Sequence, residues 1–559
     1  MNDPAPMPAD AIARVQEGLR IAHPPDPATL AAERAHLERL ETATRWKRFT
    51  GYLRLVGPGY LQSAMTLGGG TAVSSLLAGA LFGYALLWVA PLAMLIGLVM
   101  LAALAHQTLS TGMRPFEAMR RYAGPFFAWG WALGALAASV IWHFPQYSLA
   151  SACLVDMADV VGIEGLRPQA MAFVVLPWAV AISFLYGNAR LVRWYERLLK
   201  YMVWGIIVCF GWVVFRTGVD DWGALFRGFF TFQIPGERNG VAAVTIVLGG
   251  LAAAVGINMV FLYPYSLLAR GWSRPHRRLA RFDLVLGTFI PYLLATSLIV
   301  IAAANTIHLD PSFSAARISP IDAAQSLGVT IGPAGGRLVF GAGVLAMALS
   351  SITLHMLCAG FVAIEVFGWP FGSWRYRFAT LVPAVGVFGP VFWGEYAVWL
   401  AVPTSIVCGF LLPVAYIGII LLQRNTRYLG ADTPRGAGGR TWLGAMVIVT
   451  VFLTAFFAWS ALTKGPGYIR DVLKIGGEET VAVAVAVADT DTDTDADADP
   501  DPDPDPVADT DTDTDTDADT DTDTDTDPDP VADPVADPDA DPDPDPDPDA
   551  APAPAPEPP

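Results

Sequence analysis

The sequence predicts an all-α protein that crosses the membrane many times, with two of its helices broken in mid-bilayer. Hydrophobic residues make up 53% of the 559 residues. Several uninterrupted apolar stretches reach the roughly 20 residues that a helix needs to cross a bilayer. A soluble protein of this size would show amphipathic periods instead. Glycine-rich interruptions inside two of the apolar stretches indicate the breaks.

Eleven apolar stretches are long enough to be counted as membrane spans. They lie near residues 53–79, 83–110, 125–158, 167–187, 194–215, 241–269, 282–307, 333–367, 374–396, 397–424 and 440–463. Together they define a membrane domain over residues 53–463. We expect a polar cytoplasmic segment before it, residues 1–52, and a linker after it, residues 464–488.

The basic residues are distributed unevenly between alternate loops. One set of loops holds 18 of them: Arg114, Arg120, Arg121, Arg190, Arg193, Arg197, Lys200, Arg270, Arg274, Arg277, Arg278, Arg281, Arg375, Arg377, Arg424, Arg427, Arg435 and Arg440. The opposite interhelical loops hold six: Arg167, Arg216, Arg227, Arg238, Arg317 and Arg337. Basic loops stay in the cytoplasm. The pattern therefore predicts a multi-pass protein of the cell (inner) membrane with its N-terminus inside, and eleven spans place the C-terminus outside.

The acidic balance of the chain comes from its end. Residues 489–559 hold 29 of the 53 acidic residues and no Lys or Arg, so the remaining 24 acids face 35 basic residues, a net charge of +11. The tail consists of Asp-Thr, Asp-Pro and Asp-Ala dipeptides. It has almost nothing apolar to bury and repels itself, so we expect it to be disordered. We expect an appendage without a transport role, and the alternative is a low-affinity reservoir of cations on the outer face.

The two interrupted spans predict a substrate site. The first contains three consecutive glycines at 68–70, and the sixth contains Gly249, Gly250, Gly256 and, further on, Pro264. Each helical glycine costs about 1 kcal/mol, and unwound backbone at membrane depth is tolerated only where it lines a protein cavity. Breaks at matching positions of two five-helix halves are typical of inverted-repeat transporters. The expected substrate-binding residues are Thr66, Gly68, Gly69, Gly70, Thr71, Ala253, Gly256 and Asn258.

Residues 50–463 resemble the Nramp (natural-resistance-associated macrophage protein) family of proton-coupled divalent metal transporters. The family's first span reads GPGxLxSxxxxDPGN and is followed by FGYxLLW. In the same spacing this chain has residues 57–59 (GPG), Leu61, Ser63, residues 82–84 (FGY) and residues 86–88 (LLW). The resemblance implies a leucine-transporter-like (APC superfamily) fold, an inverted repeat of two five-helix halves plus an extra helix.

The chain departs from the family at the metal site. Where the family has DPGN, which supplies a carboxylate and an amide to the metal, this chain has Gly68, Gly69, Gly70 and Thr71. The family's Met-Pro-His in the sixth span aligns with residues 256–258. The resemblance therefore implies metal-site positions at Gly68, Thr71, Ala253 and Gly256, without the usual ligands. Such neutral groups favour a cation that keeps some of its water.

Proton coupling also needs a different residue. The family has two acidic residues in its third span, whereas the third span here offers His143 beside Pro145 and no carboxylate before Asp156. Histidine titrates near neutral pH, so His143 is the predicted proton carrier, with a hydrogen-bonded structural ring as the alternative. His355 is a second candidate, for which the structural role is favoured. Glu196 is expected to form a cytoplasmic gate or a surface pair.

Three functions remain open from the sequence. The first is an Nramp-like permease that moves a divalent metal cation by alternating access, with proton coupling. The second is a transporter of a small organic solute such as an amino acid, whose carboxylate would bind the backbone N–H groups of the glycine-rich break. The third is a non-transporting sensor. None is an enzyme, and no cofactor or nucleic acid is expected; the partners are the transported cation or solute and the lipid bilayer.

Overall fold

The computed structural model describes residues 27–186, 189–219, 221–309, 332–393 and 401–490. Its α-helices are α2 (Pro27–Thr42), α3 (Arg45–Leu55), α4 (Pro58–Thr66), α5 (Gly69–Phe82), α6 (Val89–Thr111), α7 (Pro115–Tyr122), α8 (Pro125–Val160), α9 (Pro168–Leu185), α10 (Ala189–Thr217), α11 (Trp222–Phe230), α12 (Ala243–Ala254), α13 (Ile257–Ala269), α14 (Arg277–Asp283), α15 (Ile290–Ala304), α17 (Pro333–Phe367), α18 (Trp374–Ala379), α19 (Gly389–Trp393), α20 (Ala401–Gly409), α21 (Leu412–Arg424), α22 (Thr426–Leu429) and α23 (Gly436–Thr490). The shorter elements are the 3₁₀ helices η1 (Arg274–His276), η3 (Ile307–Leu309), η5 (Val382–Phe388) and η7 (Gly430–Asp432), the π-helix η2 (Leu284–Phe289) and the antiparallel strands β1 (Glu237–Arg238) and β2 (Val241–Ala242).

Within the described residues, nine helices are long and apolar enough to cross a membrane. They match nine of the eleven expected spans. A tenth, the first expected span, is the pair α4 and α5, which is bent by 56°. The prediction of an all-α polytopic protein is therefore confirmed.

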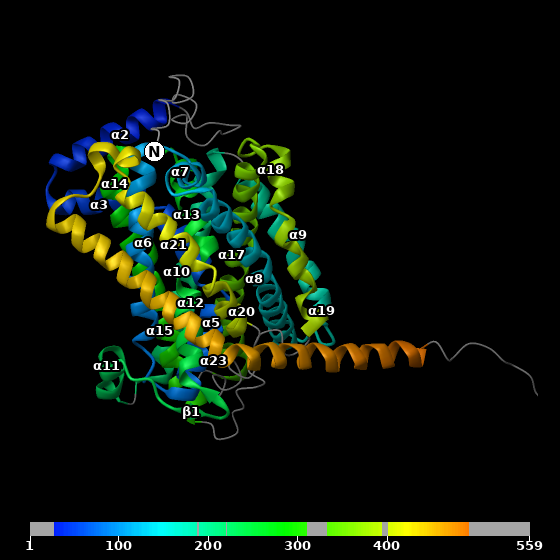
Figure 1. Cartoon of the computed structure of the whole chain (residues 1–559). Coiled ribbons are helices and arrows are strands. Elements are labelled where there is room, and N and C mark those ends of the chain that lie inside the picture. Colours follow the sequence, from blue (N-terminus) through cyan, green and yellow to red (C-terminus); the bar gives the residue numbers. More distant parts are fainter. Residues whose placement is uncertain (1–26, 187–188, 220, 310–331, 394–400, 491–559) are drawn as a thin grey trace, which may run out of the picture. The chain divides into compact units, whose positions relative to one another are not determined.

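The ninth expected span, 374–396, is not one continuous helix. It is divided into α18, η5 and α19, and it holds prolines at 383 and 390, each of which removes a backbone donor. Of these pieces, η5 and α19 pack against α8 and α9, whereas α18 packs against α17. In Figure 1, α18 and α19 lie near opposite ends of α9. The described part of this segment is therefore not among the helices long and apolar enough to cross a membrane, and its crossing stays a prediction.

The centre of the membrane domain is α17, which packs along α8 and α10. It is almost entirely buried, whereas most of α9 faces outward. Both helices are apolar on all sides, as helices in a bilayer are, so the apolar pattern alone did not separate the central helix from the peripheral one. Ser350 and Ser351 of α17 reach the first broken helix, where they donate hydrogen bonds to backbone carbonyls at the end of α4.

Both expected breaks are present, and each is narrower than its glycines suggested. The first is confined to Leu67 and Gly68, because Gly69 and Gly70 already belong to α5. The second lies at Val255 and Gly256 between α12 and α13. The prediction that Gly249 and Gly250 contribute to the second break is wrong, since both lie inside α12.

The segments that precede and follow the membrane domain both contain helix. Helix α2, in the segment expected to be polar, buries Leu37 and Leu40 against the protein. The residues proposed as a linker, 464–488, continue α23 as helix to Thr490. Residues 491–559 of the acidic tail lie outside the described part of the chain, so its expected disorder stays a prediction.

Candidate functional site

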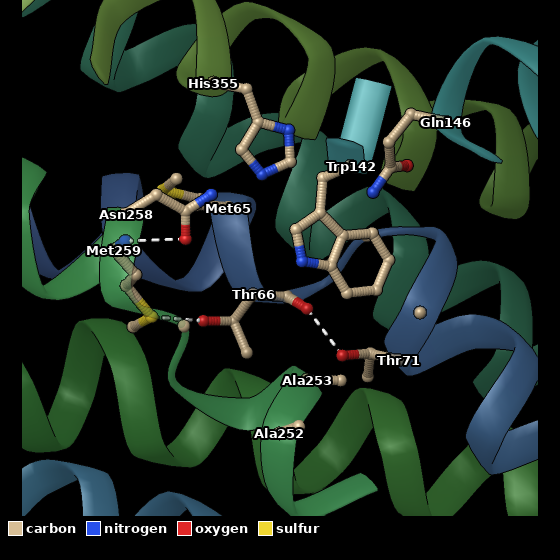
Figure 2. A pocket seen from close by; sticks show the side chains of 13 residues that line it. Met65, Thr66, Thr71, Trp142, Gln146, Ala252, Ala253, Asn258, Met259 and His355 are labelled. Carbon is tan, nitrogen blue, oxygen red and sulfur yellow. Dashed lines mark hydrogen bonds between the residues drawn. The ribbon is translucent and has the colours of Figure 1, made fainter. Parts of the chain in front are cut away.

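A buried cavity of about 30 Å³ lies where the two breaks meet. It is lined by α4, α5, α8, α12, α13 and α17 through Met65, Thr66, Gly68, Gly70, Thr71, Trp142, Gln146, Ala252, Ala253, Gly256, Asn258, Met259 and His355. Seven of the eight predicted site residues are among them, and Gly69 is not. Figure 2 shows Asn258 and Met259 on one side of the cavity and Trp142 and Thr71 on the other. The tertiary structure thus joins residues that are nearly 190 positions apart.

Two threonine hydroxyls connect the broken ends. Thr71 Oγ1 donates to the carbonyl of Thr66 at 2.6 Å, which closes the first break on itself. Thr66 Oγ1 lies 3.2 Å from the carbonyl of Ala254 and 2.9 Å from Met259 Sδ, which links the first break to the second (Figure 2). Each hydroxyl oxygen keeps acceptor capacity after donating its proton. Both threonines can therefore offer oxygen to a cation.

The side chain of Asn258 lies at the start of α13. Its Oδ1 accepts the N–H of Met259 at 2.9 Å, and its backbone carbonyl lies 3.5 Å from Cys358 Sγ. Its Nδ2 is buried and has no hydrogen-bond partner among the described residues. An amide nitrogen cannot bind a cation, so a metal at this residue must use Oδ1, which has a second lone pair.

The N-terminus of α5 is already occupied. Gly69 N–H donates to Gln146 Oε1 of α8 at 2.9 Å. The hypothesis of an organic solute relied on free N–H groups at this glycine-rich turn to hold a carboxylate. Gln146 Oε1 accepts the N–H of Gly69 in the place where the carboxylate of a solute was expected to bind. The turn therefore has fewer free N–H groups for an anion than its sequence suggested.

Glycine at position 68 leaves space that other side chains fill. A Cβ placed on Gly68 would lie 2.3 Å from Ser351 Oγ and 2.6 Å from Gln146 Nε2. A Cβ on Gly70 would lie 2.0 Å from the Trp142 ring. The space of a carboxylate side chain at position 68 is thus taken up by neutral side chains from α8 and α17.

Three soft donors at the cavity, Met65, Met259 and His355, were missed or undervalued in the sequence. Met259 supplies a thioether three residues after Gly256, and residues three apart share a helix face, so the spacing held this signal. His355 of α17 lines the cavity, is 4% exposed, and its Nδ1 has no hydrogen-bond partner in the described chain. Thioether and imidazole are both ligands of transition metals. The structural role that we favoured for His355 does not account for its position at the cavity.

His143 lies behind the cavity and does not line it. Its ring is fully buried, and Nδ1 is 2.8 Å from the carbonyl of Ser139. A carbonyl only accepts, so Nδ1 carries the proton and the lone pair of a neutral ring is on Nε2. The ring centroid lies 5.5 Å from that of His355. His355 thus stands between the cavity and the predicted proton carrier.

Charged groups gather away from the cavity, at the start of α4. Asp283 is buried and accepts the N–H groups of Gly57 at 3.0 Å and Gly59 at 2.6 Å. Glu196, 3% exposed at its side chain, forms an ion pair with Arg270. Glu196 was predicted to form either a cytoplasmic gate or a surface pair. The surface pair is wrong, because the residue is buried. The buried pair joins α10 to the end of α13.

The cavity itself carries no carboxylate. Across the described residues, no group of three or more His, Cys, Asp and Glu side chains could hold a metal ion. The donors at the cavity are neutral hydroxyl, amide and carbonyl oxygens, the thioethers of Met65 and Met259, and one imidazole. A divalent cation bound there would keep its own charge largely uncompensated, which reduces affinity and favours release.

Sequence relatives of the chain are metal transporters. The chain is 25% identical over 469 residues to the divalent metal cation transporter MntH of Burkholderia ambifaria, covering 79% of this chain and 95% of that protein. It is also 25% identical over 426 residues to the MntH of Agrobacterium fabrum, covering 72% and 87%.

The fold has a counterpart among solved structures. A crystal structure of a variant of the Eremococcus coleocola manganese transporter matches with a TM-score of 0.63 at 14% identity, covering 84% of this chain and 96% of the other. This likeness confirms the expected fold. The family model described as natural resistance-associated macrophage protein-like matches residues 59–460. The chain therefore belongs to the Nramp family.

Proposed function

We propose that this protein is a secondary transporter that moves a divalent metal cation across the membrane by alternating access. The observation that carries the proposal is the small cavity at the meeting of the two breaks. At about 30 Å³ it has room for an ion with about one or two water molecules. Pockets for organic molecules usually measure about 300–1,000 Å³. The size of the cavity therefore supports an ion over an amino acid.

We propose that the metal ligands come from both breaks. Thr66, Thr71 and Asn258 would supply side-chain oxygen, and the backbone carbonyls of Gly68, Ala253 and Gly256 would supply the rest. To this set we add Met259 Sδ and the His355 imidazole. Oxygen ligands suit magnesium and manganese, whereas thioether and imidazole favour softer ions such as cobalt or cadmium. The combined set supports selectivity for a borderline or soft divalent ion.

We also propose that a proton moves with the metal through His143. A metal bound at the cavity occupies or repels His355, and His143 is the next titratable ring, 5.5 Å away. In proteoliposomes, His143→Ala should abolish metal-driven internal acidification. The control is His106→Ala, which replaces a histidine near the end of α6 and should preserve the acidification. Acidification that survives His143→Ala would exclude His143 as the carrier.

The proposed orientation follows the basic loops. The N-terminal segment lies in the cytoplasm of the cell (inner) membrane, and α18 to α19 complete an eleventh crossing that sends the acidic tail outside. A cysteine introduced at Thr490 should react with an impermeant maleimide in intact cells. A cysteine in place of Ala31, on exposed α2, should react only after lysis.

Metal uptake into proteoliposomes tests the site directly. The full-length protein should take up cobalt or cadmium, and Thr71→Val, Asn258→Ala and Met259→Leu should each reduce uptake. Met259→Leu keeps the side-chain volume, so its effect isolates the sulfur. The matched control is Met100→Leu, a buried methionine of α6 outside the cavity. Unchanged uptake in all three variants would place the metal elsewhere.

A thermal-shift screen of metals against amino acids separates transport from the other two functions. Ligand binding raises apparent stability by mass action. Stabilisation by an amino acid and by no metal would support the organic solute instead. Metal binding without flux in proteoliposomes would support a sensor.

A further inference from the structure

A second cavity, much larger than the first, lies at the basic side of the membrane domain. Its volume is about 570 Å³. It is bounded by α2, α6, the segment η1 to α14, and the start of α23, through Glu41, Ala102, Ala105, His106, Arg274, Pro275, Arg277, Arg278, Arg281, Pro434 and Trp442. None of these residues belongs to the site at the broken helices.

Four arginines form one wall of this cavity. Arg274, Arg277, Arg278 and Arg281 are spaced three, four and seven residues apart, which places them on one face of η1 and α14. Four guanidinium groups within two helical turns repel one another unless acids or a bound anion compensate them. The balance between these arginines and the nearby acids therefore shows what the cavity can bind.

Two acids compensate only part of this charge. Asp432 lies 2.8 Å from Arg274 and 2.9 Å from Arg277, and Glu41 lies 3.5 Å from Arg278. Arg281 is exposed and makes no hydrogen bond or ion pair with a described residue. Four positive charges against two negative ones leave the wall with a net charge of +2. An anion is the ligand that this wall favours.

The opposite wall is apolar except for His106, whose Nε2 lies 2.9 Å from the carbonyl of Asp432. Ala102 and Ala105 belong to α6, and Trp442 belongs to the first turns of α23; both helices are candidate membrane spans. The indole of Trp442 is half-buried and donates Nε1–H to the carbonyl of Val99 at 3.3 Å. Tryptophan is enriched at the level of lipid headgroups. The cavity therefore spans the boundary between headgroups and hydrocarbon.

We propose that this cavity binds the phosphate headgroup of an anionic phospholipid from the cytoplasmic leaflet. Arg278 and Arg281 hold the phosphate by charge-assisted hydrogen bonds, for which the guanidinium geometry is suited. The glycerol and the first acyl carbons lie against Ala102, Ala105 and Trp442. Inorganic phosphate offers the same anion but nothing for the apolar wall. Basic pockets between membrane helices on this side commonly take lipid headgroups.

Native mass spectrometry of the full-length protein in detergent tests the proposal. Phosphatidylglycerol and phosphatidylcholine are added in competition at equal concentration, and bound lipid is counted. Each arginine near an anionic headgroup favours binding by about fivefold, so Arg278→Gln with Arg281→Gln should reduce the preference for phosphatidylglycerol by about 25-fold. Arg424→Gln with Arg375→Gln removes two arginines of the same predicted face outside the cavity and should leave the preference unchanged.

Two results would overturn the proposal. One is a preference for phosphatidylglycerol that is equal in both double variants. The other is displacement of bound phosphatidylglycerol by inorganic phosphate at equal concentration, which would assign the cavity to a soluble phosphate. Arg278 and Arg281 are exposed, so the variants should elute like the original protein and keep its helical content. This control shows that a lost preference for phosphatidylglycerol does not arise from unfolding.

Discussion

Substitution of Gly68 by alanine tests whether the first break is packed as tightly as the structure indicates. The backbone at Gly68 is extended, with φ −116° and ψ −171°, which alanine adopts without strain. The penalty is therefore steric. The new Cβ would lie 2.3 Å from Ser351 Oγ and 2.6 Å from Gln146 Nε2, so both side chains must move. Overpacking of this kind costs about 1–3 kcal/mol.

Part of that penalty is offset in the unfolded chain. Replacing glycine by alanine restricts the unfolded state, which stabilises the protein by about 0.4–1 kcal/mol. We therefore expect Gly68→Ala to lower the free energy of unfolding by about 1–2 kcal/mol. The displaced Gln146 amide would also give up its bond to the N–H of Gly69, which is 2.9 Å long.

The measurement is unfolding in mixed micelles by added sodium dodecyl sulfate, followed by the fluorescence of the 17 tryptophans. Gly205→Ala is the matched control, because Gly205 lies in α10 and an added Cβ there would meet no atom within 4 Å. That control should be neutral or stabilising. Ser351→Ala in the Gly68→Ala background should recover part of the loss, since it removes Oγ. The packing described for this break would be refuted if Gly68→Ala and Gly205→Ala had equal free energies of unfolding and Ser351→Ala recovered no stability in the Gly68→Ala background.

Three further substitutions probe the charged groups around the membrane domain. Arg337→Gln leaves Asp156, 2% exposed at its side chain, without its ion-pair partner, and should lower the free energy of unfolding by about 3 kcal/mol in the same assay. Asp283→Ala removes the acceptor of two buried N–H groups at the start of α4; faster hydrogen exchange of that turn should follow, and unchanged exchange would contradict the contact. Partial burial raises the pKa of Asp432, but the hydrogen bonds and charges of its two arginines outweigh burial and hold the pKa below its usual value. The ionised Asp432 therefore stabilises the fold fully when the pH is above the unfolded-state pKa of about 3.9. This stabilisation disappears as the pH falls through the lower pKa of the folded state. Asp432→Asn should flatten the loss of apparent melting temperature below pH ~4.

The spans were predictable because membrane helices are specified locally. A helix that crosses a bilayer needs about 20 apolar residues in a row, and one continuous segment of sequence shows whether it has them. The segment 374–396 shows the limit of this argument. Its apolar character predicted a membrane span, yet it holds two prolines and is divided into short helices, of which η5 and α19 pack against α8 and α9.

The site was predictable where it lies at the two breaks, including the side chains of Thr66, Thr71 and Asn258. Gly68 and Gly256 could be located from the sequence, since a helix break in the bilayer has few causes other than glycine or proline near it. Gln146 and His355 could not, because they come from α8 and α17, and only the packing of those helices brings them to the breaks. Their distance from the breaks along the chain leaves no periodic signal.

The sequence by itself determined an all-α membrane protein with two broken helices, and it identified the family-like positions that lack the family's ligands. Only the tertiary structure decided what fills those positions. Gln146 and Ser351 occupy the space beside Gly68, and Met259 and His355 bring a sulfur and an imidazole to the cavity. The physical reason is that a helix break is a property of local backbone, whereas a ligand set is a property of side chains that converge from separate helices.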